Sequence, residues 1–299
     1  METSGYTLRN YRPSDFDGLV GFFQLESKPT SFTSQRVSEW LSWPHFSPEQ
    51  DLFIVETETS IVGYMSLRPE LEIDRVFITC RLHHNHQRKG LAAKLLECAM
   101  HRAHELNASV AHVDVMEDNT IARKALEKHG FSPVRQYYEL KLDMAQADWE
   151  EAEKTSRGCR HLAPGEEAIL ADIQNRTFAE HWGYNPNTEE TISYIISRSH
   201  SSPEDVVLAC EEDSIIGFCL TEVIGNGEGR ISMIGTDPDF RGKGIGRKIL
   251  LAGLLYLKSK AVHSTYLTVD TVNEAALILY KSVGFENNNI LLTYEKTIR

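Results

Sequence analysis

The sequence lacks the segments that anchor a protein in a membrane or direct it to secretion. It contains no run of about 18 uncharged apolar residues, which is the length that a transmembrane helix needs. Its first residues, METSGYTLRNYRPSDFD, include no basic segment followed by an apolar run, so a secretory signal is not expected. We therefore expect a cytoplasmic protein without a membrane partner.

Cysteine is scarce as well. The chain has 5 cysteines, an odd number, and none of them forms a CxxC pair. A disulfide framework and a structural zinc site are therefore not indicated, and reduced thiols are the simplest interpretation. The run from His83 to His86 contains three histidines without a second ligand cluster. We interpret it as a solvated loop, or as histidines near phosphate, and expect no metal.

Positive charge is in the minority. The 299 residues include 31 Lys and Arg against 43 Asp and Glu, which gives a net charge of −12 at pH 7. Proteins that bind nucleic acid gain affinity by neutralising phosphates, so a nucleic-acid partner is not expected. The acidic balance suits a cationic acceptor such as an amine, although many proteins are acidic for solubility alone.

The chain contains an internal repeat. Four signals centred on glycine or asparagine recur at a constant distance of 154 residues. The pairs are Gly63 and Gly217, Gly90 and Gly244, Asn119 and Asn273, and Gly130 and Gly284. Together with the chain length, this repeat predicts two domains, over 1–145 and 159–299. The polar stretch 144–158 between them is either a linker or a short surface helix.

The second copy is the easier one to interpret. Apolar residues at helical spacing predict helices over 166–180, 188–198, 243–260 and 273–282. Runs rich in β-branched residues predict strands over 205–211, 214–224, 230–236, 264–269 and 290–297. The first copy has the same order. Three consecutive strands followed by alternating helices and strands predict an α/β fold with a mixed sheet covered by helices.

A glycine-rich loop joins a predicted strand to a long helix at 237–247. Glycines allow a tight turn and a close approach to a ligand, and a helix start presents unpaired N–H groups and a positive dipole end. Together they form an anion site suited to a pyrophosphate. The loop residues that we expect to bind it are Arg241, Gly242, Lys243, Gly244, Ile245, Gly246 and Arg247.

Two other phosphate loops are excluded by spacing. A Walker loop needs GxxxxGK followed by Ser or Thr, and no such run surrounds Gly246. A dinucleotide fingerprint needs GxGxxG, but Arg247 stands at the position of the third glycine after Gly242 and Gly244. A glycine-rich turn without a ligand is the remaining alternative.

The run Arg241-x-x-Gly244-x-Gly246 after a strand resembles the Q/R-x-x-G-x-G/A pyrophosphate signature of the GNAT acetyltransferase superfamily. The segment 273–285 resembles the family's N-x-x-A-x-x-x-Y-x-x-x-G-F run. The first copy carries a related but less regular loop, in which Gln87 and Ala92 stand where Arg241 and Gly246 stand. Its residues implied to bind the cofactor are Gln87, Arg88, Lys89, Gly90, Leu91 and Ala92. The resemblance implies two tandem GNAT domains, an acyl-CoA N-acyltransferase activity and acetyl-CoA as co-substrate.

The resemblance also assigns the chemistry to the second copy. It places a tyrosine near the sulfur of CoA, and Tyr280 can donate a proton to a leaving thiolate because a phenol remains a donor at neutral pH. The aligned residue in the first copy is Leu126, which cannot donate. We therefore expect the first domain to be degenerate or non-catalytic. Packing alone is the alternative role of Tyr280.

Three residues at the end of the strand before the loop are implied to stabilise the carbonyl oxygen. These are Ile234, Gly235 and Thr236, through their backbone N–H groups. In GNAT proteins this strand splays from its neighbour, and Gly235 is compatible with a bulge there. Asn273 resembles the asparagine that contacts CoA, and it can also serve as an N-cap.

The general base is less well defined by the sequence. Glu222 on the third strand of the second copy is the first candidate, and Glu228, His181 and a water chain remain open. A solvated surface carboxylate is the alternative for Glu222. The aromatic and polar segment 178–184 either lines the acceptor pocket or packs as a loop between helices.

The tandem arrangement is similar to that of the mycothiol synthases, whose second half is the better match. Arg230, Glu222 and Thr268 stand where that family has glutamate, lysine and tyrosine, so the acceptor is left open among small-molecule and peptide amines. We predict transfer of an acetyl group from acetyl-CoA to a primary amine. A CoA-binding sensor or a scaffold without turnover is the alternative.

Overall fold

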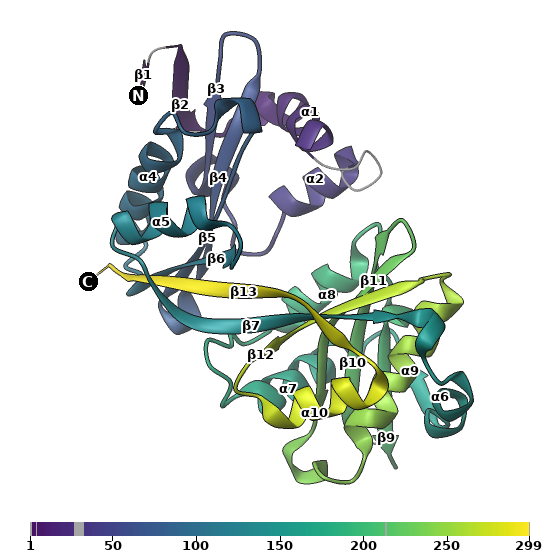
Figure 1. Ribbon diagram of the computed structural model, residues 1–299. Coiled ribbons are helices and arrows are strands. Elements are labelled where there is room, and N and C mark those ends of the chain that lie inside the picture. Colours follow the sequence, from purple (N-terminus) through teal and green to yellow (C-terminus); the bar gives the residue numbers. More distant parts are fainter. Residues whose placement is uncertain (1, 4, 27–32, 213, 299) are drawn as a thin grey trace. The chain divides into compact units, whose positions relative to one another are not determined.

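The computed structural model describes residues 2–3, 5–26, 33–212 and 214–298. Contacts divide the chain into two compact units, which we call unit 1 (Met1–Gln136 with Leu291–Arg299) and unit 2 (Tyr137–Ile290). Each unit is a mixed sheet with helices packed on it (Figure 1). None of the described helices combines the length and the apolar character that crossing a lipid bilayer requires.

Unit 1 follows the order predicted for the first copy. Its helices are α1 (Phe16–Glu26), α2 (Ser34–Leu41), α3 (Pro48–Asp51), α4 (Leu91–Glu105) and α5 (Thr120–Lys128). Its first strands are β1 (Glu2–Thr3), β2 (Tyr6–Asn10), β3 (Leu52–Glu56), β4 (Ile61–Glu70), β5 (Arg75–Leu82) and β6 (Val110–Met116). The sheet order is β1-β2-β3-β4-β5-β6-β13, where β13 is the strand Glu286–Thr297.

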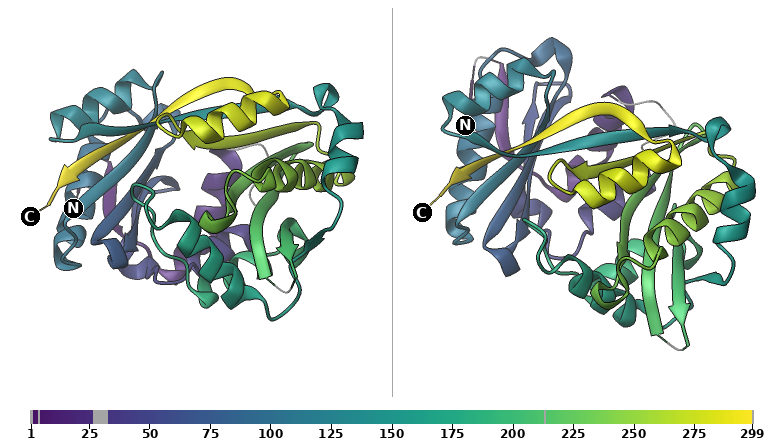
Figure 2. Two further views of the ribbon diagram at one scale, coloured as in Figure 1. Left: turned by 90° about the horizontal axis from the view of Figure 1, so that it is seen from below. Right: turned by 60° about the horizontal axis from the view of Figure 1, so that its bottom comes forward.

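Unit 2 includes the stretch 144–158, which the sequence left open as a linker or a helix. It forms helix α6 (Trp149–Thr155), which packs beside α9, as both views of Figure 2 also show. The other helices are α7 (Glu167–Phe178), α8 (Glu189–Ser197), α9 (Ile245–Ser259) and α10 (Glu274–Val283). The strands are β8 (Cys159–His161), β9 (Val206–Glu211), β10 (Ser214–Gly225), β11 (Glu228–Thr236) and β12 (Ser264–Asp270). Each helix and strand predicted for this copy is present within a few residues.

The sheet of unit 2 is covered on both faces. Side chains of a strand alternate between its two faces, and β9 follows this rule. Val206 and Leu208 pack with residues of α7 and α8, whereas Val207 and Ala209 pack with residues of α9. The order is β7-β12-β11-β10-β9-β8, with β11 and β12 parallel and the other pairs antiparallel. The predicted α/β fold with a mixed sheet is confirmed.

The final strands of the two copies are exchanged. Strand β7 (Ser132–Asp143) closes the first copy in sequence, yet its residues 137–143 pair with β12 of unit 2. Strand β13 (Glu286–Thr297) closes the second copy, yet its residues 291–297 pair with β6 of unit 1. The compact units therefore differ from the ranges 1–145 and 159–299, because each sheet is completed by the last strand of the other copy.

Candidate active site

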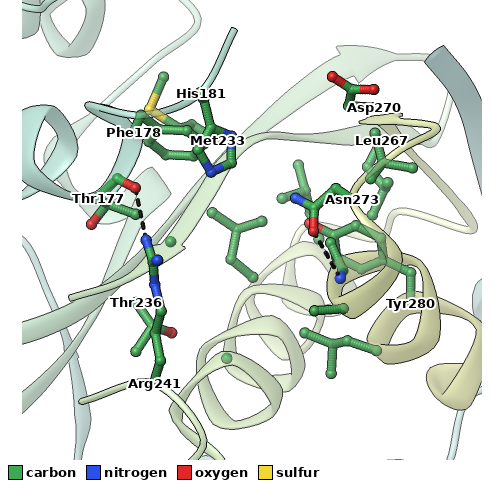
Figure 3. A pocket seen from close by; sticks show the side chains of 18 of the residues that line it. Thr177, Phe178, His181, Met233, Thr236, Arg241, Leu267, Asp270, Asn273 and Tyr280 are labelled. Carbon is green, nitrogen blue, oxygen red and sulfur yellow. Dashed lines mark hydrogen bonds between the residues drawn. The ribbon is translucent and has the colours of Figure 1, made fainter. Parts of the chain in front are cut away.

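Unit 2 contains a cavity of about 580 Å³ between the glycine-rich loop, the ends of two strands and two helices. Figure 3 shows side chains from these elements around it. The predicted residues that line it are Ile234, Gly235, Thr236, Arg241, Gly242, Gly244, Ile245, Gly246, Asn273 and Tyr280. Of the predicted residues in unit 2, Lys243, Arg247 and Glu222 are outside this lining.

The cavity opens where two parallel strands separate. Strands β11 and β12 pair from Glu228 with Ser264 to Ile231 with Leu267, and the described pairing ends there. Beyond that point β11 continues to Thr236 along β10 alone. Backbone groups of residues 232–236 on the edge toward β12 are therefore available to a ligand. This is the geometry expected for an inserted thioester arm and an N–H donor to its carbonyl oxygen.

The bulge in this region is not at Gly235. The register between β10 and β11 shifts between Leu220 and Thr221, which leaves Ser232 as the additional residue. Gly235 itself lies in register opposite Phe218. A Cβ at Gly235 would lie 2.5 Å from Cγ2 of Thr177 and 2.8 Å from Cζ of Phe218. The glycine therefore permits close packing of α7 on the strand, and the bulge with which it was considered compatible lies at Ser232 instead.

The glycine-rich loop has the shape of an anion cradle. Gly242 and Gly244 have φ of 77° and 80°, in the left-handed region that favours glycine. A Cβ at either glycine would meet nothing within 4 Å, so the space beside both residues is open. Helix α9 starts at Ile245 without a capping side chain, and the first N–H groups of a helix have no intrahelical acceptor. These residues fit a diphosphate.

The basic residues of the loop have separate partners. The Nη2 of Arg241 donates to the carbonyl oxygen of Thr177 at 2.9 Å. The Nζ of Lys243 lies 4.5 Å from the centre of the Phe240 ring. Arg247 pairs with Glu151 of α6 through two hydrogen bonds of 2.8 Å, so its guanidinium supports the interface between α6 and α9. Its predicted contact with the cofactor is not supported by this geometry.

Helix α10 and its N-cap contribute five residues to the cavity, and two of them, Asn273 and Tyr280, are predicted site residues. Asn273 is its N-cap and accepts a hydrogen bond from the N–H of Ala276 at 3.2 Å, as in Figure 3. It also lines the cavity, so the two roles considered for it are compatible. The Tyr280 side chain is 7% exposed. Burial raises the pKa of its phenol, which therefore stays protonated at neutral pH.

Glu222 lies outside the cavity. It is on β10 opposite Arg230, and its carboxylate is 3.4 Å from Nε2 of His200 and 3.4 Å from Oγ of Ser232. The hydrogen bond with His200 lowers the pKa of Glu222. Glu222 itself is not among the lining residues, although its partner Ser232 is, so the role of Glu222 as general base stays a prediction.

The aromatic segment after α7 lines the cavity, as one of the two interpretations predicted. Phe178, His181, Trp182 and Tyr184 all belong to the lining. Burial lowers the pKa of His181, and the positive charge of Arg241 lowers it further. The imidazole is therefore neutral at neutral pH and can accept a proton.

Sequence reasoning missed Thr177, Tyr137 and Asp270, which also line the cavity. Asp270 ends β12 just before Asn273, and a polar residue at a strand end beside a predicted site was a usable signal. Tyr137 carried no such signal, because it reaches unit 2 only through the strand exchange.

The loop of unit 1 repeats the backbone of the loop in unit 2. Arg88 and Gly90 have φ of 59° and 78°, and they align with Gly242 and Gly244. The Nζ of Lys89 donates to the hydroxyl of Tyr6 at 2.7 Å. The Nε2 of Gln87 donates to the carbonyl oxygen of Leu82 at 3.0 Å. Leu91 and Ala92 open helix α4.

Unit 1 lacks a counterpart of the buried phenol. Leu126, which aligns with Tyr280, is buried at 8% exposure.

In the described parts of the chain, no group of three or more His, Cys, Asp or Glu is arranged to hold a metal ion.

Comparison with known proteins gives the family. The model of the acetyltransferase (GNAT) family matches residues 19–131 and 168–285. A mycothiol acetyltransferase of Stackebrandtia nassauensis is 27% identical over 259 residues, covering 84% of this chain and 84% of that protein. One of Amycolatopsis mediterranei is 29% identical over 252 residues, covering 79% of this chain and 81% of that protein.

Solved structures show the same fold. A GCN5-related N-acetyltransferase from Sphaerobacter thermophilus has a TM-score of 0.73 at 20% identity, covering 100% of this chain and 98% of that chain. A tandem GNAT protein from the clavulanic acid biosynthesis pathway has a TM-score of 0.71 at 14% identity, covering 98% and 99%. Since the family model matches both copies over most of the chain, the protein belongs to the acetyltransferase (GNAT) family and is a tandem N-acetyltransferase, as the sequence predicted.

Proposed function

We propose that unit 2 carries out the acetyl transfer to a small-molecule amine. One observation carries this proposal: the anion cradle, the open strand edge, the buried phenol of Tyr280 and the imidazole of His181 all line one cavity. When bound, acetyl-CoA supplies the acetyl thioester. The residues that would hold it are the loop from Gly242 to Gly246, the edge from Ile234 to Thr236, and Asn273.

Tyr280 is the proposed general acid. Its phenol is protonated and lines the cavity from α10, and a phenol can donate to a departing thiolate. In this role Tyr280 gives its proton to the sulfur as the bond between the acetyl carbon and the sulfur breaks. Solvent then restores the phenol.

His181 is the proposed general base, in place of Glu222. A base must lie within hydrogen-bond reach of the proton it accepts, and His181 lines the cavity whereas Glu222 does not. Because its pKa is lowered, the imidazole accepts the proton of the amine as the new bond between nitrogen and the acetyl carbon forms. Backbone N–H groups of residues 234–236 are proposed to stabilise the negative charge on the carbonyl oxygen.

Unit 1 is proposed to bind the phosphates of CoA without turnover. The support is the shared backbone of the two loops, with Gly90 at φ 78° and Gly244 at φ 80°. Leu126 stands where the proposed acid stands in unit 2, and a leucine cannot donate a proton.

The identity of the acceptor is not inferred from the names of the similar proteins. The similar proteins are named for mycothiol, but Arg230, Glu222 and Thr268 replace three side chains of that family's pattern. The acidic charge of −12 supports a protein without a nucleic-acid partner. We also infer a cytoplasmic location, since the five cysteines are free thiols in the described structure.

The test of this function is Tyr280→Phe. Release of CoA thiol in the presence of an accepted primary amine should fall by roughly 10²–10⁴-fold, which is the usual contribution of acid–base catalysis. The affinity for acetyl-CoA, measured by calorimetry, should be unchanged, because the ring remains.

The matched control is Tyr256→Phe. Tyr256 is a buried tyrosine of α9 outside the lining, and its hydroxyl donates to Asp205 at 2.9 Å. Its loss should cost about 1 kcal/mol of stability and leave turnover intact. If Tyr280→Phe turned over at the wild-type rate, Tyr280 would not be the general acid. A wild-type protein that binds acetyl-CoA but acetylates no amine would instead be a sensor.

A further inference from the structure

The part of the cavity beyond the cradle is mostly aromatic and aliphatic. Its wall comes from the segment after α7 and from the ends of β7, β11 and β12. The apolar or aromatic side chains in it are Tyr137, Phe178, Trp182, Tyr184, Ile231, Met233, Ile234, Leu267 and Val269. The polar ones are His181, Ser232, Thr236, Thr268 and Asp270. A wall of this kind contacts the apolar body of a ligand.

Three rings of this wall, those of Phe178, His181 and Tyr184, are held by contacts within the protein. The ring of Phe178 stacks on Tyr184 with centroids 5.3 Å apart, and His181 lies edge-on to Phe178 at 4.7 Å. The hydroxyl of Tyr184 donates to Oδ1 of Asn175 at 2.8 Å, and Asn187 adds two further hydrogen bonds to Asn175. Preorganised rings lose little entropy on binding, so the wall is a built surface.

The same cavity carries little charge. Among the described lining residues, Asp270 is the one acidic side chain, and Arg241 is the one side chain with a permanent positive charge. Figure 3 shows Asp270 on the side of the pocket opposite Phe178 and His181. Asp270 accepts a hydrogen bond from the N–H of Val272 at 3.1 Å, which fixes its carboxylate at the end of β12.

This charge pattern discriminates between the amines that the sequence left open. An aminoglycoside or a polyamine carries several ammonium groups, and each one needs a carboxylate or solvent when it is buried. One carboxylate serves one ammonium group, so a polycation would leave its further ammonium groups without a carboxylate among these lining residues.

We infer that the acceptor is a primary monoamine with an aromatic body, whose ring packs on Phe178 and Trp182 and whose ammonium pairs with Asp270 before reaction. This inference rests on the proposed function of unit 2. In the reaction the ammonium leaves Asp270 and loses one proton to solvent. The free amine then passes a second proton to His181 as its nitrogen bonds to the acetyl carbon, and the carbon–sulfur bond breaks as Tyr280 protonates the sulfur. Asp270 is thus an anchoring residue and takes no proton.

The test compares two classes of amine with the full-length protein. We expect kcat/KM for 2-phenylethylamine and tryptamine to exceed that for spermidine and kanamycin by roughly tenfold or more, because the polycations leave buried charges unpaired. Equal or higher kcat/KM for spermidine or kanamycin would overturn the inference. So would a complete lack of turnover with both arylalkylamines.

Two variants separate this inference from the proposed function. Trp182→Ala and Asp270→Asn should each raise the KM for 2-phenylethylamine by roughly tenfold and leave the KM for acetyl-CoA unchanged. Ile278→Ala is the control, since Ile278 is 70% exposed on α10 and outside the lining. An unchanged amine KM in both variants would refute the aromatic acceptor. If the wild-type protein did not bind acetyl-CoA, the proposed function itself would be refuted instead.

Discussion

Gly244→Glu is the perturbation that tests the anion cradle. Gly244 has φ 80°, and a side chain there would project into open space. The glutamate therefore fits sterically, at a cost of about 1–2 kcal/mol for a left-handed residue other than glycine. Its carboxylate would stand where a phosphate of CoA is expected to bind.

The expected loss of affinity follows from this charge. Two like charges about 4 Å apart repel by about 4 kcal/mol at an effective dielectric constant of about 20. That energy corresponds to a roughly thousandfold weaker affinity for acetyl-CoA at this site. The KM for acetyl-CoA in the thiol-release assay and the calorimetric Kd both measure it.

Gly165→Glu is the matched control within unit 2. Gly165 has φ 89°, a Cβ there would meet nothing within 4 Å, and it lies outside the cavity lining. The control therefore adds the same charge and a similar backbone strain, and the two variants should melt at similar temperatures. If Gly244→Glu bound acetyl-CoA with wild-type affinity, the loop would not be the diphosphate site. If both variants lost the same affinity for acetyl-CoA, the effect would not be local to the loop.

Three further predictions follow from named contacts. The kcat measured with saturating amine and acetyl-CoA should fall on acidification only below about pH 6.5, the ordinary pKa of histidine, because the lowered pKa of His181 keeps its imidazole neutral to lower pH; a decline in kcat that begins well above this pH would contradict His181 as base. Gly235→Ala should destabilise unit 2 by about 1–3 kcal/mol, since the new methyl group would lie 2.5 Å from Thr177, and an unchanged melting temperature would contradict this packing. Tyr294→Ala removes a fully buried ring near the end of the chain and should increase hydrogen exchange in β6 of unit 1 rather than in β12; the reverse pattern would refute the strand exchange.

Much of the fold and part of the site could be predicted because their signals are local. Gly284 ends α10 with φ 103°, as a C-cap glycine does, and the spacing of apolar residues gave α9 within two residues of its bounds. The cradle glycines needed only the short motif around Gly244. Tyr280 was found through the resemblance of segment 273–285 to the family.

The sequence by itself determined the repeat, the element order, the phosphate loop and the residue that differs between the copies, Leu126 against Tyr280. Only the tertiary structure decided which sheet each final strand joins, because the backbone hydrogen bonds that pair strands do not depend on side-chain identity. It also decided that Glu222 faces His200 and that Arg247 pairs with Glu151, since such contacts join residues far apart in the chain. The aromatic wall of the cavity likewise forms only after α7, β7 and β12 come together around it.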